Sequence, residues 1–282
     1  MSHIKTNIAQ LEQAAPVILS SAQRKPLVLV GMVGIAKTQW IKSTYHDMYA
    51  EHLGLSSDQV GFIQERVANR DSAEIAGVAL PCKTDDGEMI TTFTKPPLIT
   101  KIERTGLEHG IILFDEMLQA PADVQKVLAD LLDPDERTLA GWPIPDGWII
   151  AATGNRVADK SGATRLLSHL LNRCRVFELE FSVNQWADWA RDNGVNPLAV
   201  DAAVTYHGDG FFADSVPTED GPFCTPRSLV HAASDLTAFM DTDAFDGAYI
   251  PSHIEALIAS SIGQRAAGML SRHIAMADEV PQ

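Results

Sequence analysis

A glycine-rich loop that ends in a lysine and a threonine is the strongest chemical signal in this sequence. It follows the short apolar run 27–30 and precedes a stretch of helical character. Glycines let backbone N–H groups turn inward around a phosphate, and a helix start adds positive potential. The lysine would reach the β- and γ-phosphates of a nucleotide, and the threonine hydroxyl would bind Mg²⁺. The predicted phosphate loop consists of Gly31, Met32, Val33, Gly34, Ile35, Ala36, Lys37 and Thr38.

One position departs from the usual pattern of such loops. The residue before the lysine is normally glycine, and here it is Ala36. Alanine fits there if the backbone stays in a region open to residues with a Cβ atom. A chance glycine-rich turn is the alternative interpretation of the whole segment. The strand, loop, Lys-Thr pair and helix nevertheless follow one another in the order that a phosphate loop requires.

Two carboxylates, Asp115 and Glu116, end the apolar run 111–114. Parallel strands present their carboxyl ends to the ligand crevice, so we expect Asp115 near Thr38, where it would hold Mg²⁺ mostly through water. Glu116 would polarise the attacking water, and the pair together implies hydrolysis. A pair of solvated carboxylates that cap the next helix is the alternative, which the apolar residues before them disfavour.

An amide, Asn155, follows another apolar run at 148–154. A buried strand that ends in a polar amide beside the carboxylates suggests a sensor of the γ-phosphate and of the water. An asparagine chosen for the turn after Gly154 is the alternative, because asparagine is common in turns. The residue alone does not decide between these two interpretations.

The elements that must position these side chains alternate between strand and helix up to about residue 182. Strands are expected at 27–30, 60–67, 110–116, 148–155 and 175–181, hairpins around 85–87 and over 137–147, and helices at 4–19, 37–53, 120–132 and 163–173. Later segments are all helical, at 183–193, 197–207, 226–241 and 251–275. The pattern predicts an α/β fold. It comprises an αβα sandwich with a parallel sheet over residues 1–182 and an all-helical lid domain over residues 183–282.

Composition narrows the classes of function. The formal charge of -15 weighs against binding nucleic acid over a broad face. The three cysteines, Cys82, Cys174 and Cys224, form no CxxC pair, which disfavours zinc and redox motifs and suits a reducing cytoplasm. No run of eighteen apolar residues exists, so we expect no membrane span, and we expect no secretory signal.

The motifs resemble those of a known family in their order and at typical intervals. GMVGIAKT, ILFDE and AATGN resemble Walker A, Walker B and sensor 1 of the AAA+ ATPases. LLNRCR at 170–175 resembles the helix end that carries the arginine finger, with Arg173 as the first choice and Arg175 as the second. TPRSL at 225–229 resembles the sensor 2 start of the lid helix, with Arg227 as the sensor. Each arginine has a structural alternative, at a helix end for Arg173 and at a helix start for Arg227.

Within this family the sequence looks like the MoxR-like group of phage and bacterial type. The hairpin 137–147 before sensor 1 belongs to that pattern, and some members share the GIAK-type loop. The resemblance implies an enzyme that hydrolyses ATP with Mg²⁺ in a ring homo-oligomer, commonly a hexamer, in which Arg173 reaches the neighbour's nucleotide. It also implies a protein client and a von Willebrand factor A domain partner. The alternatives are a non-hydrolysing nucleotide switch, supported only by Ala36, and a nucleic-acid motor, against which the charge weighs.

Overall fold

The structure, a computed structural model, describes residues 3–159, 167–218, 220–245, 247 and 249–277. The chain divides into two compact units, each with an apolar core of its own. The first unit holds the residues up to 6, together with 10–31 and 37–179, and the second holds 7–9, 32–36 and the chain from 180 on. Most of the phosphate loop therefore groups with the second unit, while the strand before it and the helix after it belong to the first. No helix in the described ranges is long and apolar enough to cross a membrane.

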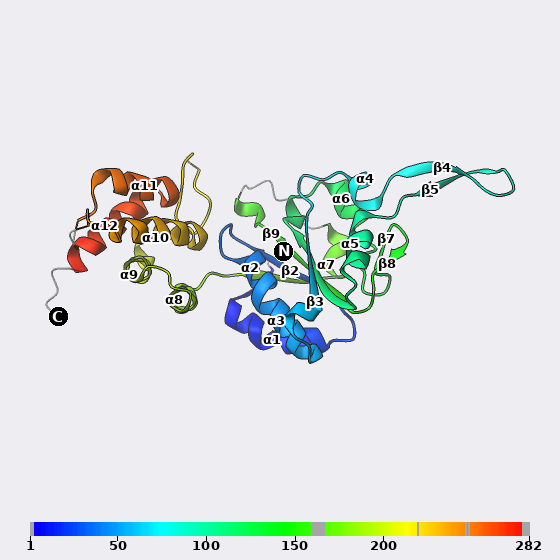
Figure 1. Cartoon of the computed structure of the whole chain (residues 1–282), viewed down its shortest axis with the longest axis horizontal. Coiled ribbons are helices and arrows are strands. Elements are labelled where there is room, and N and C mark those ends of the chain that lie inside the picture. Colours follow the sequence, from blue (N-terminus) through cyan, green and yellow to red (C-terminus); the bar gives the residue numbers. More distant parts are fainter. Residues whose placement is uncertain (1–2, 160–166, 219, 246, 248, 278–282) are drawn as a thin grey trace. The chain divides into compact units, whose positions relative to one another are not determined.

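A six-stranded, all-parallel sheet forms the centre of the first unit (Figure 1). Its strands are β1 (Ile4–Thr6), β2 (Leu27–Gly31), β3 (Val60–Arg66), β6 (His109–Asp115), β9 (Trp148–Gly154) and β10 (Arg175–Leu179). The order β1-β10-β2-β9-β6-β3 places β9 between β2 and β6. The carboxyl ends of these three strands therefore adjoin, at the edge of the sheet where α/β folds bind ligands.

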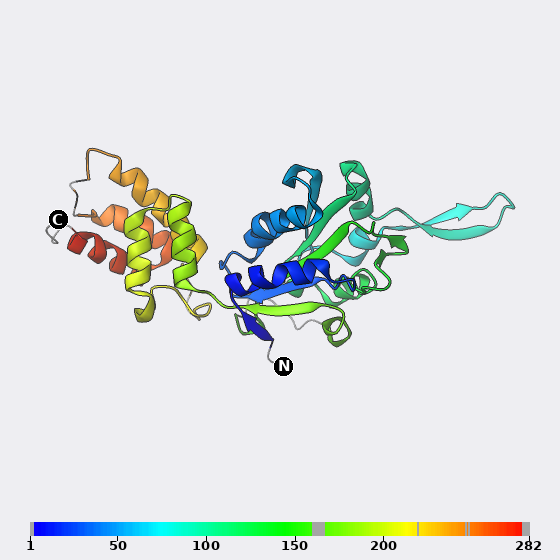
Figure 2. The same cartoon turned by 90° about the horizontal axis from the view of Figure 1, so that it is seen from below.

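Helices cover both faces of this sheet (Figures 1 and 2). Helices α1 (Ile8–Ser20), α2 (Lys37–Trp40) and α3 (His46–Leu53) lie on one face, and a π-helical turn, Ile41–Tyr45, joins the last two. Helices α4 (Ser72–Ala76), α5 (Pro97–Thr105), α6 (Ala122–Val127) and α7 (Ser168–Leu171) lie on the other. Val28 and Val30 belong to the core beneath α5 and α6, while Leu27 and Leu29 point the opposite way and are also fully buried. Burial on both faces explains why the central strands β2, β6 and β9 are nearly continuous apolar runs. The predicted αβα sandwich is confirmed.

Several element boundaries differ from those predicted. The expected helix 4–19 begins only at Ile8, because Ile4–Thr6 forms β1 and pairs with β10 at the edge of the sheet. Strand pairing there overrides the helical spacing of the apolar residues. The expected helix 120–132 ends at Val127. Residues 163–166 of the expected helix 163–173 lie outside the described residues, and α7 covers only Ser168–Leu171.

The first unit also contains two antiparallel hairpins, and the sequence predicts both. The first pairs β4 (Ala79–Lys83) with β5 (Met89–Phe93), and the second pairs β7 (Thr138–Leu139) with β8 (Trp142–Pro143). A positive φ of 83° at Gly87 suits the turn of the first hairpin, since glycine adopts this conformation without steric cost.

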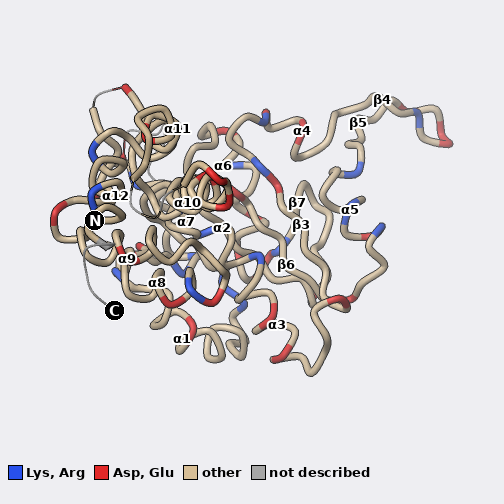
Figure 3. Tube along the Cα trace, turned by 60° about the vertical axis from the view of Figure 1, so that its left-hand side comes forward, with Lys and Arg blue, Asp and Glu red and all other residues tan. Residues whose placement is uncertain are grey.

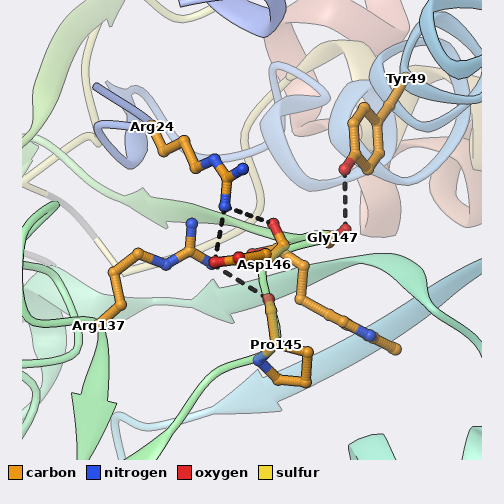
Figure 4. A network of polar contacts seen from close by, with 7 residues as sticks. Arg24, Tyr49, Arg137, Pro145, Asp146 and Gly147 are labelled. Atoms are coloured by element: carbon orange, nitrogen blue, oxygen red, sulfur yellow. Dashed lines mark hydrogen bonds and ion pairs between the residues drawn. The ribbon is translucent and has the colours of Figure 1, made fainter. Parts of the chain in front are cut away.

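A polar network holds the second hairpin at the end of the sheet where the strands begin (Figure 4). Arg24 Nη1 donates to the main-chain oxygen of Asp146 at 2.9 Å and to its carboxylate at 3.0 Å. The Tyr49 hydroxyl donates to the carbonyl of Gly147 at 2.8 Å, and Arg137 donates to main-chain carbonyls on either side of this pair. Burial raises the pKa of Tyr49, so the phenol stays a neutral donor. Burial, and then repulsion by Arg24, lowers the pKa of Arg137.

From Val183 on, the second unit consists of helices joined by loops. Its helices are α8 (Val183–Asp192), α9 (Pro197–Thr205), α10 (Pro226–Met240), α11 (Ser252–Ile262) and α12 (Gln264–Ala277). The single helix expected over 251–275 is two helices that meet at Gly263, where φ is +82°. A Cβ atom at Gly263 would lie 2.6 Å from the carbonyl oxygen of Pro222, so both the conformation and the close approach favour glycine.

Gly110→Ala is expected to lower the free energy of unfolding by about 1–3 kcal/mol, because the added methyl would overpack the core. A Cβ atom at Gly110 would lie 2.5 Å from the indole ring of Trp148, which is fully buried and donates to Leu107 O at 3.2 Å. Gly208→Ala is the matched control, since its Cβ would enter open space. Urea titration measures the free energy of unfolding of both variants. Equal values for the two would contradict tight packing around Trp148.

Candidate nucleotide-binding site

The predicted phosphate loop leaves the centre of the sheet. Strand β2 is buried along its whole length and ends at Gly31, and α2 begins at Lys37. The side chain of Lys37 is also buried, and its Nζ donates to Gly31 O at 2.8 Å and to Asn155 Oδ1 at 3.2 Å. The structure thus brings the predicted lysine and the predicted sensor amide together. One buried positive charge lies between the loop and the end of β9.

Ala36 adopts the left-handed backbone conformation, with φ +67°. Alanine was expected to fit if its backbone stayed in a region open to residues with a Cβ atom. The left-handed region is only narrowly open to such residues and costs them roughly 1–2 kcal/mol, whereas glycine enters it freely. Gly34, two residues earlier, also has a positive φ, of +80°. The usual glycine before the lysine would therefore suit this backbone better than the alanine does.

Ala36→Gly is expected to raise the free energy of unfolding by about 0.5–1 kcal/mol. Relief of the left-handed strain should exceed the extra entropy that glycine gives the unfolded chain. Ala187→Gly, in the interior of α8, is the control of opposite sign, because glycine within a helix destabilises by roughly 0.5–1 kcal/mol. Thermal unfolding compares the melting temperatures of the two variants with that of the wild type. A lower melting temperature for both variants would contradict strain at Ala36.

The carboxylate of Asp115 is the centre of the polar contacts at this site. Its Oδ1 accepts hydrogen bonds from Thr38 Oγ1 at 2.8 Å and from Thr153 Oγ1 at 2.6 Å. Its Oδ2 accepts one from Gln64 Nε2 at 2.7 Å. The contact between Thr38 and Asp115 joins two residues that the sequence analysis expected to lie close together. Sequence reasoning did not identify Gln64 and Thr153, whose placement depends on the pairing of β3 and β9 with β6.

The donor set at Thr38 and Asp115 fits Mg²⁺. A hydroxyl and a carboxylate supply the hard oxygen ligands that this ion prefers. Across the described residues, no three or more His, Cys, Asp or Glu side chains gather as a metal site. An ion held here would therefore have few protein ligands and would complete its shell with phosphate oxygens and water, as is usual for Mg²⁺.

Glu116 follows strand β6 in a strained conformation. Its φ is +58° and its ψ +33°, and its side chain is exposed. The main-chain N–H of Glu116 donates to Thr153 Oγ1 at 3.2 Å, and that hydroxyl in turn donates to Asp115. Strained residues of this kind cluster at functional sites, where surrounding contacts hold them. Thr153 thus ties the backbone of Glu116 to the carboxylate of Asp115.

The two arginines that follow α7 in the sequence, Arg173 and Arg175, have different surroundings. Arg173 forms an ion pair with Asp133 at 2.9 Å and donates to Ala129 O at 3.1 Å. Arg175 donates to Ser21 Oγ at 2.7 Å and to a main-chain carbonyl at 3.1 Å. The ion pair of Arg173 is only partly buried, whereas Arg175 belongs to the strand β10 itself.

Arg173 lies toward the opposite end of the sheet from the phosphate loop. In the register of β10 and β2, Arg175 pairs with Leu27 and Leu179 pairs with Gly31. Four residue steps separate these two pairs, which is roughly 13 Å of strand. Arg173 precedes that first pair by two more residues. The structure therefore does not bring Arg173 together with Lys37 of its own chain.

Arg227 lies at the start of α10 in the second unit, and its side chain is exposed. Its main-chain N–H donates to the carbonyl of Gly34 at 3.2 Å, and both residues belong to the second unit. Thr225 caps the helix, accepting a hydrogen bond from the N–H of Ser228. The predicted sensor arginine thus begins a capped helix, and its backbone contacts the phosphate loop.

Comparison with known proteins shows similarity at the level of the fold. No family model matches the sequence, and no curated protein matches it. The crystal structure of NtrX from Brucella abortus in complex with ADP is 14% identical with a TM-score of 0.50, and the match covers 97% of this chain and 54% of NtrX. A mutant of RuvB from Thermotoga maritima is 10% identical with a TM-score of 0.44, covering 94% of this chain and 69% of that one. This chain thus spans about half the length of NtrX. The parallel sheet with its helical C-terminal region, together with the likeness to NtrX, shows that the chain has the fold of the AAA+ P-loop ATPases.

Proposed function

We propose that this chain is a Mg-ATP-dependent ATPase of the MoxR-like group, which works at the subunit interfaces of a ring homo-oligomer to remodel or assemble a protein client. One observation carries the proposal. Lys37 donates a hydrogen bond to Asn155, and Thr38 donates one to Asp115, at the adjoining carboxyl ends of β2, β9 and β6. These four side chains have the chemistry that binding a triphosphate requires.

The proposed roles follow from the charge that develops during phosphoryl transfer. Mg²⁺, when bound at Thr38 and Asp115, would neutralise charge on the β- and γ-phosphates. Lys37 would bind the same phosphates, and the amide of Asn155 would orient the γ-phosphate and the attacking water. Glu116, directly after Asp115, would accept the proton of that water. Residues 31–38 would surround the phosphates with backbone N–H groups, and Arg227 would contact the nucleotide from the lid.

The ring is proposed because Arg173, the expected arginine finger, does not lie beside the phosphate loop of its own chain. An arginine finger stabilises the charge that develops on the γ-phosphate and so accelerates phosphoryl transfer. Arg173 is roughly 13 Å or more of strand away from its own phosphate loop. We therefore propose that Arg173 acts on the nucleotide of the next subunit, in a closed ring such as a hexamer.

The wider assignment completes the proposal. The nucleotide-binding domain would occupy residues 1–182 and the lid 183–282, in a cytoplasmic protein of a bacterium or a phage. The partner of the ring would be a von Willebrand factor A domain protein, on the strength of the resemblance to the MoxR-like group.

A second candidate function has one observation in its favour. The left-handed backbone at Ala36 places a methyl where such loops usually have none, which would slow or weaken nucleotide binding. This departure from the usual loop is the one feature that favours a nucleotide switch, which would bind ATP without hydrolysing it.

ATP turnover measured against protein concentration, with the mass followed by light scattering, separates the two functions. The ATPase predicts that turnover per subunit rises as Mg-ATP drives oligomer formation. A switch predicts ATP binding without turnover at any concentration. The same titration of Lys37→Ala is the control for contaminating ATPases, since this variant lacks the proposed phosphate ligand.

A further inference from the structure

The β4–β5 hairpin extends away from the six-stranded sheet without a third strand to support it (Figures 1 and 2). Within the described part of the chain, β4 and β5 pair only with each other. Every residue of both strands is exposed. An isolated two-stranded hairpin is at best marginally stable in water, and a further strand or a packed face normally supports it.

Apolar side chains are concentrated on this hairpin. Five large apolar residues on it, or directly beside it, leave between 43% and 61% of their surface exposed: Val78, Leu80, Met89, Ile90 and Phe93. The register places Met89 and Phe93 on one face of the hairpin and Val78, Leu80 and Ile90 on the other, so both faces expose apolar side chains. Exposed apolar surface on a soluble protein often marks a site that binds a partner. The hairpin therefore has the composition of a surface that another chain covers.

The hydrogen-bond pattern shows which edge of the hairpin is open. The N–H of Thr94 donates to Val78 O at 2.9 Å, next to the first pair of the ladder. Hydrogen-bonded and non-hydrogen-bonded pairs alternate in an antiparallel ladder, so the pair of Thr91 with Pro81 is non-hydrogen-bonded. The N–H and C=O groups of Thr91 therefore point away from β4.

The two outer edges of the hairpin differ in what they offer. Pro81 has no N–H, so the outer edge of β4 is interrupted, as in many protected edge strands. Strand β5 contains no proline, and by the same alternation Met89, Thr91 and Phe93 all present N–H and C=O groups outward. The open edge is therefore that of β5.

The tip of the hairpin is acidic (Figure 3). Asp85, Asp86 and Glu88 carry three carboxylates there, against the single positive charge of Lys83. Charge complementarity of this kind selects partners and fixes the direction in which they lie. A strand added to β5 would be favoured if it carried basic residues beside the tip.

We propose that the outer edge of β5 binds an extended, apolar segment of a protein partner, which adds as a third strand and places lysine or arginine beside the acidic tip. Main-chain hydrogen bonds to Met89, Thr91 and Phe93 supply the affinity, and the exposed apolar side chains of β5 (Met89, Ile90 and Phe93) pack against the added strand. We take this partner to be the client of the proposed ATPase. Only that identification rests on the proposed function, because the binding of a strand to β5 does not depend on ATP hydrolysis.

Binding is measured by fluorescence anisotropy with a labelled peptide of alternating valine and threonine flanked by lysines. Thr91→Pro removes an outward N–H and is expected to weaken binding about tenfold or more. Thr91→Val keeps that N–H and the β-branched shape, so it should bind within about twofold of the wild type. Amide exchange checks the hairpin itself, because the N–H of Thr94 should stay protected in both variants. The amides of Met89, Thr91 and Phe93 should become protected only when the peptide is present.

Asp85→Asn combined with Asp86→Asn and Glu88→Gln should weaken binding several-fold and remove most of its salt dependence. Absence of peptide binding by the wild type, or equal affinity of Thr91→Pro and Thr91→Val, would overturn the proposal. A self-associated form that Thr91→Pro dissociates would also overturn it, because the edge would then hold a second copy of this chain. ATP turnover without peptide should be the same in both Thr91 variants. A loss of peptide binding can therefore be distinguished from a loss of ATP hydrolysis.

Discussion

Arg173→Ala is expected to bind ATP as the wild type does and to lose about three to five orders of magnitude in turnover. Arginine fingers in related phosphoryl-transfer systems are worth about this much. Binding should survive because Arg173 lies toward the far end of the sheet from its own phosphate loop. Phosphate release under steady-state conditions measures turnover, and titration with a fluorescent ATP analogue measures binding.

The ion pair of Arg173 with Asp133 calls for a structural control. Asp133→Asn removes the charge of the partner and leaves the arginine in place. It should keep turnover within a few-fold of the wild type if the arginine acts on nucleotide. A loss as large as that of Arg173→Ala would instead indicate that the pair serves local structure.

Mixing two inactive variants tests action across the interface. Lys37→Ala subunits lack the phosphate ligand but carry Arg173, and Arg173→Ala subunits bind ATP but lack the finger. In an equal mixture, about a quarter of the interfaces in a closed ring would join an intact site to an intact finger. Turnover near that fraction of the wild type supports a shared site, whereas no recovery at any ratio argues against it.

The sequence was informative wherever a local pattern decides the structure. The apolar runs before Gly31, Asp115 and Asn155 are long enough to require buried parallel strands, and the adjoining ends of those strands follow from the sheet order. The contacts of Lys37 with Asn155 and of Thr38 with Asp115 are consequences of that arrangement. Both hairpins could also be predicted, the first from its Asp85-Asp86-Gly87 turn and the second from the segment 137–147.

Pairing between distant strands decides the features that sequence patterns did not reveal. Gln64 reaches Asp115 only because β3 lies beside β6 in one particular register, which no local spacing encodes. Strand β1 forms because Ile4–Thr6 pairs with the edge of β10. The spacing of the apolar residues over 4–19 instead suggests one helix that includes these three residues. The left-handed backbone of Ala36 likewise depends on how the loop turns, and the residue type alone argues against it.

Thr153 links the two carboxylate residues of the site, and this bears on the proposed base. Its hydroxyl accepts from the N–H of Glu116 and donates to Asp115. The backbone of Glu116 is thereby held in its left-handed conformation next to the proposed Mg²⁺ ligand. A substitution that keeps the size of the side chain should preserve this arrangement and change only the ability to accept a proton.

Glu116→Gln is therefore expected to bind Mg-ATP within about threefold of the wild type while turnover falls by about 10²–10⁴, the range typical of general-base catalysis. Because ATP is held without being hydrolysed, the oligomer that ATP induces should persist, and light scattering should show a stable high mass. Glu136→Gln removes the same charge from an exposed position in the turn before β7 and should leave turnover unchanged. Turnover by Glu116→Gln at the rate of the Glu136 variant would remove Glu116 from the role of base. Loss of ATP binding in Glu116→Gln would mean that this carboxylate serves the metal or the loop instead.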